Sequence, residues 1–230
     1  MDTVIKTTNL SRYFGAEDIQ VKALDNIDLE IKRGEFSAIV GPSGSGKTTL
    51  LHLIGGLDNP TSGKVELSGT NIARMSGTEL SNFRRDHIGF VFQSYNLIPV
   101  LSAEENIEYI MLLQGVSQSE RKSRVKEILE TVGLEGLGNR RPAQLSGGQQ
   151  QRVAVARAMV SEPDIILADE PTANLDSTTG IALLEMMREL NERRQMTFVF
   201  STHDQKIMDR AKRLINLRDG IIESDSQQKA

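Results

Sequence analysis

The stretch Gly41-Pro42-Ser43-Gly44-Ser45-Gly46-Lys47-Thr48 fits the pattern G-x-x-x-x-G-K-[ST] and follows residues 36–40, an apolar run of strand length. The three glycines let the backbone turn so that consecutive N–H groups point into one concave anion site at the start of the next helix. Lys47 is then placed to reach the β- and γ-phosphates of a nucleotide, and the Thr48 hydroxyl to bind Mg²⁺. A glycine-rich turn without a ligand is the alternative. The strand pattern before the loop and the helical pattern after it favour a phosphate-binding loop.

The composition excludes several classes of protein. The 230 residues, enough for one or two domains, contain no cysteine, which excludes a disulfide scaffold and a thiolate metal site. A formal net charge of -4 gives no electrostatic reason to expect nucleic-acid binding, and we expect the basic pairs Arg84-Arg85 and Arg140-Arg141 at the solvated surface. No apolar run approaches the roughly 18 residues that a membrane span needs. We therefore expect a soluble, cytoplasmic protein.

Strand patterns lie on both sides of the loop. Residues 4–10 and 23–31 carry partly alternating apolar residues and predict antiparallel edge strands that precede the loop strand. Further short strands are predicted at residues 64–67 and 88–92. Tyr13 lies between the first two strands, where its ring can either stack on a purine base or pack on its own sheet. The residues alone leave both interpretations open.

Helical patterns replace strand patterns between about residues 94 and 160. The patterns Ser102-x-x-Glu105 and Ser117-x-x-Glu120 have the spacing of a capping box, in which two side chains bind free backbone N–H groups at a helix start. Gly133 is placed to end the second of these helices. We therefore predict a helical insertion between two strands.

A glycine pair opens the last helix of this insertion. Ser146 and Gln149, in Leu145-Ser-Gly-Gly-Gln149, again have capping-box spacing, so the simplest interpretation is a well-capped helix. Gly147 and Gly148, however, leave the backbone bare at a helix N-terminus, where the partial positive charge favours an anion. The same end is therefore a candidate site for a second phosphate.

Two carboxylates follow a buried strand. Residues 165–168 form a continuous apolar run that is typical of a parallel strand covered on both faces, and Asp169 and Glu170 come directly after it. Doubly wound sheets place their ligand sites at this end of their strands. Asp169 is suited to holding Mg²⁺, and Glu170 to orienting and deprotonating a water. The alternative is an ordinary solvated strand end.

A histidine follows the next predicted strand. His203 comes after residues 197–202 and is expected at the same sheet edge as the two carboxylates. A single histidine is more often structural than catalytic, and we keep that interpretation for His52 and His87. The remaining pattern predicts a helix and two short strands, at residues 177–194, 213–217 and 221–223.

The order and spacing of these motifs resemble one family over essentially the whole chain, the ATP-binding-cassette ATPases. The matching motifs are the Walker A loop, the Q-loop glutamine, the signature sequence, the Walker B strand with its glutamate, the D-loop and the switch histidine, at Gly41–Thr48, Gln93, Leu145–Gln149, Ile165–Glu170, Ala173–Asp176 and His203. The D-loop begins with alanine where many members have serine. The resemblance implies an α/β P-loop NTPase fold with a mostly parallel core sheet, an antiparallel β subdomain and a helical subdomain at about 94–160, in a single domain over residues 1–230.

The resemblance also implies a set of site residues. The catalytic residues it implies are Glu170, His203, Gln93 and Lys47. The magnesium ligands are Thr48, Gln93 and Asp169. The nucleotide-binding residues are Tyr13 as the adenine-stacking aromatic, the loop with Thr49, and the signature motif, that is Gly41, Pro42, Ser43, Gly44, Ser45, Gly46, Lys47, Thr48, Thr49, Ser146, Gly147, Gly148 and Gln149.

The implied activity is the hydrolysis of MgATP to power a separate integral membrane permease. In the family the signature motif completes the nucleotide site of a partner, so we expect a homodimer of two head-to-tail copies with two ATP molecules between them. We expect membrane contact only through the permease, on the cytoplasmic face of the inner membrane, and no nucleic-acid partner. Residues 51–58 and 88–93, and the early end after Glu223, resemble the lipoprotein-releasing and macrolide-exporter ATPases.

The permease contact is expected beside Gln93. The apolar residues that follow it are expected either to line a groove for a permease helix or to pack inside the helical subdomain, namely Tyr95, Leu97, Ile98 and Leu101. One alternative function is a cell-division or signalling regulator that pulls on a membrane partner without moving cargo. Another is a nucleotide-binding scaffold without turnover, which the complete set of Lys47, Asp169, Glu170 and His203 disfavours.

Overall fold

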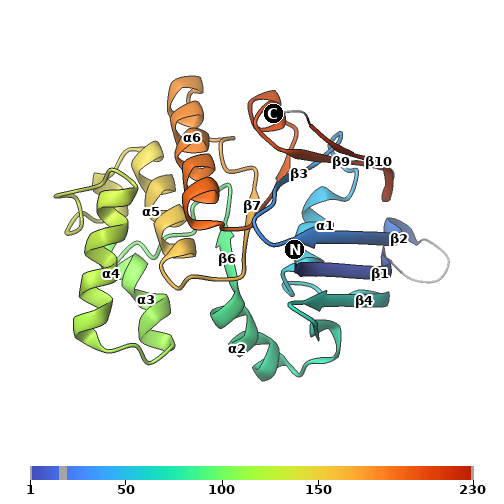
Figure 1. Cartoon of the computed structure of the whole chain (residues 1–230), viewed down its shortest axis with the longest axis horizontal. Coiled ribbons are helices and arrows are strands. Elements are labelled where there is room, and N and C mark those ends of the chain that lie inside the picture. The colour runs from blue at the N-terminus through green and yellow to red at the C-terminus, as the bar shows by residue number, and fades with distance from the viewer. Residues whose placement is uncertain (1, 16–19, 229–230) are drawn as a thin grey trace.

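The computed structural model describes residues 2–15 and 20–228. In this part of the chain the strands form two sheets, and three helices are inserted between two strands of the larger sheet. Figure 1 shows these helices at one end of the molecule and the smaller sheet at the other. The three helices are α3 (Ala103–Leu113), α4 (Gln118–Thr131) and α5 (Gly147–Met159). No helix of the described residues is both long and apolar enough to cross a bilayer.

The smaller sheet is antiparallel, with its strands in the order β2-β1-β4-β5. The strands predicted before the loop therefore do not extend the loop strand's own sheet, but form a sheet of their own. The reason is that their apolar faces are buried, with α1 (Lys47–Ile54), against the larger sheet. The strands of the smaller sheet are β1 (Thr3–Phe14), β2 (Val21–Lys32), β4 (Ser62–Leu67) and β5 (Thr70–Asn71).

The larger sheet has the order β10-β9-β3-β8-β7-β6, and each neighbouring pair is parallel except β10 with β9. Val40 pairs with Thr202, and Asp169 pairs with Ser201, so β3, β7 and β8 end at one edge. The predicted mostly parallel core sheet is confirmed. Its strands are β3 (Phe36–Val40), β6 (Ile88–Val91), β7 (Ile165–Asp169), β8 (Phe198–Thr202), β9 (Arg213–Arg218) and β10 (Ile221–Gln227).

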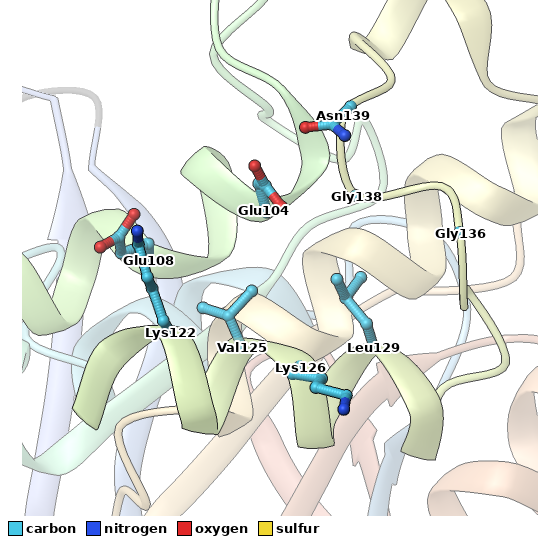
Figure 2. Close-up of a pocket in the computed structure, with 9 residues that line it drawn as sticks. All are labelled: Glu104, Glu108, Lys122, Val125, Lys126, Leu129, Gly136, Gly138 and Asn139. Atoms are coloured by element: carbon cyan, nitrogen blue, oxygen red, sulfur yellow. The ribbon is translucent and has the colours of Figure 1, made fainter. Parts of the chain in front are cut away.

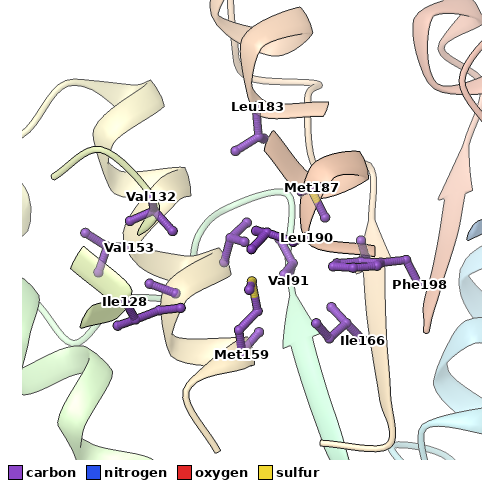
Figure 3. Close-up of a cluster of buried hydrophobic side chains, with 14 of the residues drawn as sticks. Val91, Ile128, Val132, Val153, Met159, Ile166, Leu183, Met187, Leu190 and Phe198 are labelled. Atoms are coloured by element: carbon purple, nitrogen blue, oxygen red, sulfur yellow. The ribbon is translucent and has the colours of Figure 1, made fainter. Parts of the chain in front are cut away.

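One face of the larger sheet is covered by the inserted helices and by α6 (Ser177–Arg194), which has the predicted bounds. Figure 3 shows Val91, Ile166 and Phe198 of neighbouring strands meeting Met159 of α5 and side chains of α6. All are almost fully buried. This shared apolar cluster fixes α5 against the sheet, so the N-terminus of α5 has a defined place relative to the strand ends.

The helix starts agree with the predicted caps except at one position. Both halves of the box are present at Ser102 and at Ser146. At Ser117 only the serine half forms, because the Glu120 carboxylate binds Arg124 at 2.6 Å instead of returning to the backbone. Gly133, at φ +67°, follows the end of α4 as predicted.

Two helices were not predicted from the sequence, α2 (Gly77–His87) and the short α7 (Gln205–Met208). Helix α2 starts with a complete capping box of Ser76 and Glu79. The expectation that Arg84 is a solvated surface residue is wrong, because its Nη1 donates to Gly56 O at 2.6 Å and the side chain is half-buried. Arg84 therefore ties α2 to the turn after α1.

Asp164, just before β7, joins two turns and the end of α2 through its carboxylate. It accepts hydrogen bonds from Arg33 Nη2 at 2.8 Å, Ser68 Oγ at 3.1 Å and His87 Nδ1 at 2.8 Å. Burial alone would raise the pKa of Asp164, but the hydrogen bonds from Arg33, His87 and Ser68 together lower it. A carboxyl whose pKa is lower in the folded state stabilises that state above its unfolded pKa, and the contribution is lost as the pH falls through the folded pKa.

We predict that Asp164→Asn lowers the free energy of unfolding by about 1–2 kcal/mol at pH 7, because the charged acceptor of three donors is lost. The difference from wild type should shrink as the pH falls below about 4, because the unfolded chain then binds a proton and the folded carboxyl does so only at a lower pH. Urea unfolding at pH 7 and at pH 3 measures both values. Asp209→Asn is the control, at an exposed carboxyl that among the described residues accepts a side-chain hydrogen bond only from Gln205. A difference that is the same at both pH values would contradict this account.

Candidate functional site

The predicted phosphate loop connects β3 to α1, and its glycines have different tasks. A Cβ atom on Gly46, at φ +101°, would collide with the Ala23 carbonyl, so this position is fixed by packing. Gly44, at φ +79°, has open space where its Cβ would be. Glycine accepts these left-handed conformations without the strain that other residues carry. The loop is therefore closely packed on one side and open on the other, as a phosphate cradle requires.

Lys47 and Thr48 lie at the centre of this loop. Lys47 is 8% exposed, and its Nζ donates to the carbonyls of Gly41 and Pro42 at 2.9 Å each. Thr48 Oγ1 donates to Asp169 Oδ1 at 3.2 Å, so the loop and the end of β7 are in direct contact. Two predicted magnesium ligands are thus neighbours, although 121 positions separate them in the sequence.

The Glu170 carboxylate is held by both of its oxygens. Thr202 Oγ1 donates to Oε2 at 3.0 Å, and His203 Nδ1 lies 2.6 Å from Oε1. Glu170 itself has φ +44°, a left-handed conformation that costs free energy in a residue other than glycine and is often found at functional sites. The side chain is only 15% exposed. Glu170 is thus largely shielded from bulk water, and its two partners fix the direction of the carboxylate.

His203 does not fit the usual structural role of a single histidine. Its side chain is 71% exposed, and the bond from Nδ1 to Glu170 leaves Nε2 available for a ligand. His87 does fit that role, since it binds Asp164 and stacks on Phe83 with ring centroids 4.2 Å apart.

A cavity of about 670 Å³ brings most of the predicted residues together. This volume is within the range of small-molecule sites. Its walls include three residues that sequence reasoning did not assign, Val21, Lys22 and Ala23 at the start of β2. The predicted residues in the walls are Pro42, Ser43, Gly44, Gly46, Lys47, Thr48, Thr49, Gln93, Glu170 and His203.

Tyr13 is not among the residues that line this cavity. Its hydroxyl donates to Asp25 Oδ1 at 2.7 Å, and the Lys22 ammonium lies 5.4 Å from its ring centroid. Lys22 does line the cavity, so Tyr13 stands behind it in the described structure. Stacking of Tyr13 on adenine stays a prediction.

The signature residues 146–149 are not among the residues that line the cavity. Ser146 is exposed at the N-terminus of α5, where it forms the predicted capping box with Gln149. Packing also explains why position 148 is a glycine, because a Cβ there would collide with the Thr179 methyl group. The helix end, whose first N–H groups have no partner within the helix, therefore lies outside the cavity of its own chain.

Sequence reasoning missed two contacts that hold the predicted residues. Thr202 binds Glu170, and Asn174 Nδ2 donates to Gln93 O at 2.9 Å. Thr202 ends the strand beside β7, so the parallel pairing of the two strands is the signal that would have found it. Asn174 lies in the expected D-loop, and its partner is 81 positions away.

A second hollow, of about 500 Å³, lies between α3 and α4. Figure 2 shows Glu104 and Glu108 projecting from one helix, with Lys122 and Lys126 on the other. Its lining includes none of the predicted site residues. The chemistry of the motifs is therefore gathered at the strand ends and not in this hollow.

The donor set at the strand ends fits a magnesium ion bound together with a nucleotide. Magnesium is commonly held by one or two carboxylates, substrate phosphates and water, and not by an all-protein cage. Thr48 Oγ1 and Asp169 Oδ1 are hard oxygen donors at the open side of the loop. Among the described residues no group of three or more His, Cys, Asp or Glu is arranged for a metal. A phosphate cradle joined to strand-end carboxylates defines a P-loop nucleoside triphosphatase.

Comparison with known proteins places the chain more narrowly. The family model of the ABC transporters matches residues 24–173. An ABC transporter ATP-binding protein of Thermotoga maritima is 48% identical over 223 residues, 97% of this chain and 95% of that protein. The macrolide export ATP-binding/permease protein MacB of Hyphomonas neptunium is 47% identical over 98% of this chain, which spans 35% of that protein.

A solved structure is similar over nearly its whole length. It is the dimeric, post-hydrolysis structure of the ATP-binding cassette MJ0796, a protein of Methanocaldococcus jannaschii, bound to ADP and Pi. Its TM-score is 0.90 at 43% identity, covering 98% of this chain and 99% of that one. The chain belongs to the ABC transporter family, and it is an ATP-hydrolysing, ATP-binding subunit similar to the macrolide-exporter ATPases.

We predict that Lys47→Ala weakens MgATP binding by about 10- to 100-fold, the loss expected for charged hydrogen bonds, and abolishes turnover. Calorimetry and phosphate release measure the two effects. Lys64→Ala, at an exposed lysine of β4, is the control. Unchanged affinity and turnover in a folded Lys47→Ala protein would remove the loop from the nucleotide site.

Proposed function

We propose that this chain binds MgATP in the cavity at the ends of β3, β7 and β8 and cleaves it with Glu170 as the general base. The observation that carries the proposal is that Lys47, Thr48, Glu170 and His203 line one cavity, and that Asp169 is hydrogen-bonded to Thr48. These groups supply phosphate binding, metal ligands and a proton acceptor, which are the parts that phosphoryl transfer to water needs.

Each residue has a separate task in this proposal. The loop N–H groups and Lys47 hold the β- and γ-phosphates. Thr48, Asp169 and Gln93 hold Mg²⁺, which neutralises charge on the phosphate oxygens when it is bound. Glu170 accepts the proton of a water placed for in-line attack, while Thr202 keeps the carboxylate in position. His203 orients Glu170 through Nδ1 and reaches the γ-phosphate through Nε2.

We predict that Glu170→Gln lowers hydrolysis by about 10²–10⁴-fold, or roughly 3–5 kcal/mol of barrier, because the amide keeps the shape but cannot accept the proton. ATP binding should persist, and the ATP-bound pair should accumulate because its nucleotides are no longer cleaved. Phosphate release and light scattering with and without ATP measure both. Glu189→Gln, at an exposed carboxylate of α6, is the control. A Glu170→Gln protein with wild-type turnover that stays monomeric in ATP would show that Glu170 is not the base.

A second copy of the chain completes the site in this proposal. The exposed N-terminus of α5, with Ser146, Gly147, Gly148 and Gln149, lies outside its own cavity and is suited to bind the γ-phosphate of a partner. Two copies related by a two-fold axis bury two nucleotides with the same surface used twice. MJ0796, which is similar in fold and sequence, is dimeric in its solved structures. Loss of the shared γ-phosphate after hydrolysis then lets the pair open.

The proposed permease contact is an apolar groove of about 240 Å³ between β6, α3 and α5. Of the four residues predicted to line it, only Ile98 does so. Leu97 packs on the core, and Tyr95 and Leu101 are half-buried. The apolar walls are completed by strand β6, the residue after its end and helix α3, through Phe90, Phe92, Tyr109 and Ile110.

The groove suits a short amphipathic helix, and we propose that an integral membrane permease supplies it on the cytoplasmic face of the membrane. The relative MacB supports such a partner, since it joins an ATP-binding part to a permease in one protein. Binding there places the permease next to Gln93, whose segment forms one wall of the groove. The cycle of pairing and opening then moves the membrane partner.

We predict that single cysteines at Ile98 and Tyr109 crosslink to the membrane partner, because both side chains are exposed at the groove. The chain has no cysteine of its own, so each variant carries one thiol. A cysteine at Leu97, which packs on the core, is the matched control and should not react. Mass spectrometry after crosslinking of the intact complex measures which of these positions form a product with the membrane partner. No product from either groove position would place the permease elsewhere.

A further inference from the structure

The segment that carries Gln93 is held by side chains that bind its backbone carbonyls. Arg157 donates from Nη2 to Tyr95 O at 2.8 Å and from Nη1 to Asn96 O at 2.5 Å. Asn174 donates to Gln93 O at 2.9 Å. Gln151 Nε2 lies 3.5 Å from Phe92 O while it donates to Pro171 O at 2.8 Å. Four of the five carbonyls from residue 92 to residue 96 are therefore bound by side chains from other elements.

The backbone of this segment needs such support. Tyr95 has φ +62° and Asn96 has φ +49°, so two consecutive residues other than glycine are left-handed. Asparagine tolerates the left-handed region, but it is unfavourable for a bulky residue such as Tyr95 and persists there only where surrounding contacts impose it. The two carbonyls of this pair are the two that Arg157 binds. A planar guanidinium can hold both at once, which a lysine ammonium on a flexible stem cannot do in the same fixed geometry.

Arg157 also lines the apolar groove between β6, α3 and α5, but in the described structure its hydrogen bonds go to Tyr95 and Asn96. None of the ion pairs among the described residues includes it, although its side chain is half-buried. Burial lowers the pKa of the Arg157 guanidinium, so its charge is partly removed from water. The carbonyl dipoles of Tyr95 and Asn96 are what compensate that charge. The half-buried guanidinium thus stabilises the geometry of the turn after Gln93.

We propose that Arg157 is a positioning residue that sets the place of Gln93 in the nucleotide cavity and links it to α5. The link is short, since Arg157 binds carbonyls only two and three positions after Gln93. Helix α5 begins at the signature residues 146–149, and Arg157 lies near its other end, so Arg157 connects the signature end of α5 to the Gln93 segment. A movement of α5 on pairing with a second copy is therefore passed to Gln93 through this side chain. The inference rests on the proposed role of Gln93 as a magnesium ligand.

The test compares Arg157→Met with Arg152→Met. Both arginines lie on α5 and bind backbone carbonyls, but Arg152 Nη1 binds Val132 O at the end of α4, away from Gln93. Arg157→Met should lower kcat about 10-fold or more while KM for ATP changes less than about 3-fold, because Gln93 is misplaced and the phosphate loop is not. It should also raise the Mg²⁺ concentration needed for half-maximal hydrolysis. Arg152→Met should do neither, and Arg157→Lys should fall between wild type and Arg157→Met.

A double-mutant cycle with Gln93→Ala separates positioning from general damage. If Arg157 acts through Gln93, Arg157→Met should lower kcat less than about 2-fold in the Gln93→Ala background. The same loss of kcat in both backgrounds would overturn the proposal. An equal effect of Arg152→Met would overturn it as well.

Hydrogen exchange gives a readout that does not depend on hydrolysis. The amides of residues 93–98 should exchange faster in Arg157→Met than in wild type, and should be unchanged in Arg152→Met. Unchanged exchange at these residues in a folded Arg157→Met protein would overturn the inference. Failure of the proposed function is seen separately, as absence of turnover in the wild-type protein measured in the same series. If Arg157→Met does not fold, the milder Arg157→Lys carries both measurements.

Discussion

The site depends on the parallel register of β3, β8 and β7. Because Val40 pairs with Thr202 and Asp169 pairs with Ser201, the three strands end together, and whatever follows them lies at one edge. The phosphate loop follows β3, Glu170 follows β7, and His203 follows β8. Parallel strands covered on both faces are held by apolar burial, so this register does not depend on any ligand. The core thus places the charged groups before a nucleotide arrives.

Strain and burial are concentrated around this edge. Glu170 and Tyr95 are left-handed without being glycine, and Lys47 is nearly buried. Local hydrogen bonds stabilise each of them. Thr202 and His203 bind the Glu170 carboxylate, Arg157 binds the Tyr95 turn, and two loop carbonyls bind the Lys47 ammonium. Such local compensation keeps side chains in conformations that a free chain would rarely adopt. We infer that the site is preorganised, which is how fixed dipoles and charges assist phosphoryl transfer.

Features that depend on neighbouring residues, or on the order of motifs along the chain, could be predicted from the sequence. The strand–loop–helix pattern, the buried runs that end in Asp169 and in Thr202, and the box at Ser146 are all visible within a few residues. What it did not predict depends on partners far apart in the chain. Arg84 binds Gly56 and Arg157 binds Tyr95, and neither pairing leaves a local pattern. The full capping box predicted at Ser117 did not form because Glu120 binds Arg124 instead. Local spacing alone does not show which of two possible partners a side chain binds.

The central claim is that the strand ends and the loop form one MgATP site that a second copy completes. A crystal structure of the Glu170→Gln chain grown with ATP and Mg²⁺ tests it most directly. We predict a triphosphate in the loop Gly41–Thr48, a metal bound to Thr48 and Asp169, and the partner's Ser146 against the γ-phosphate. A nucleotide bound outside the loop, or a pair of chains whose α5 N-termini lie away from the phosphates, would contradict the account.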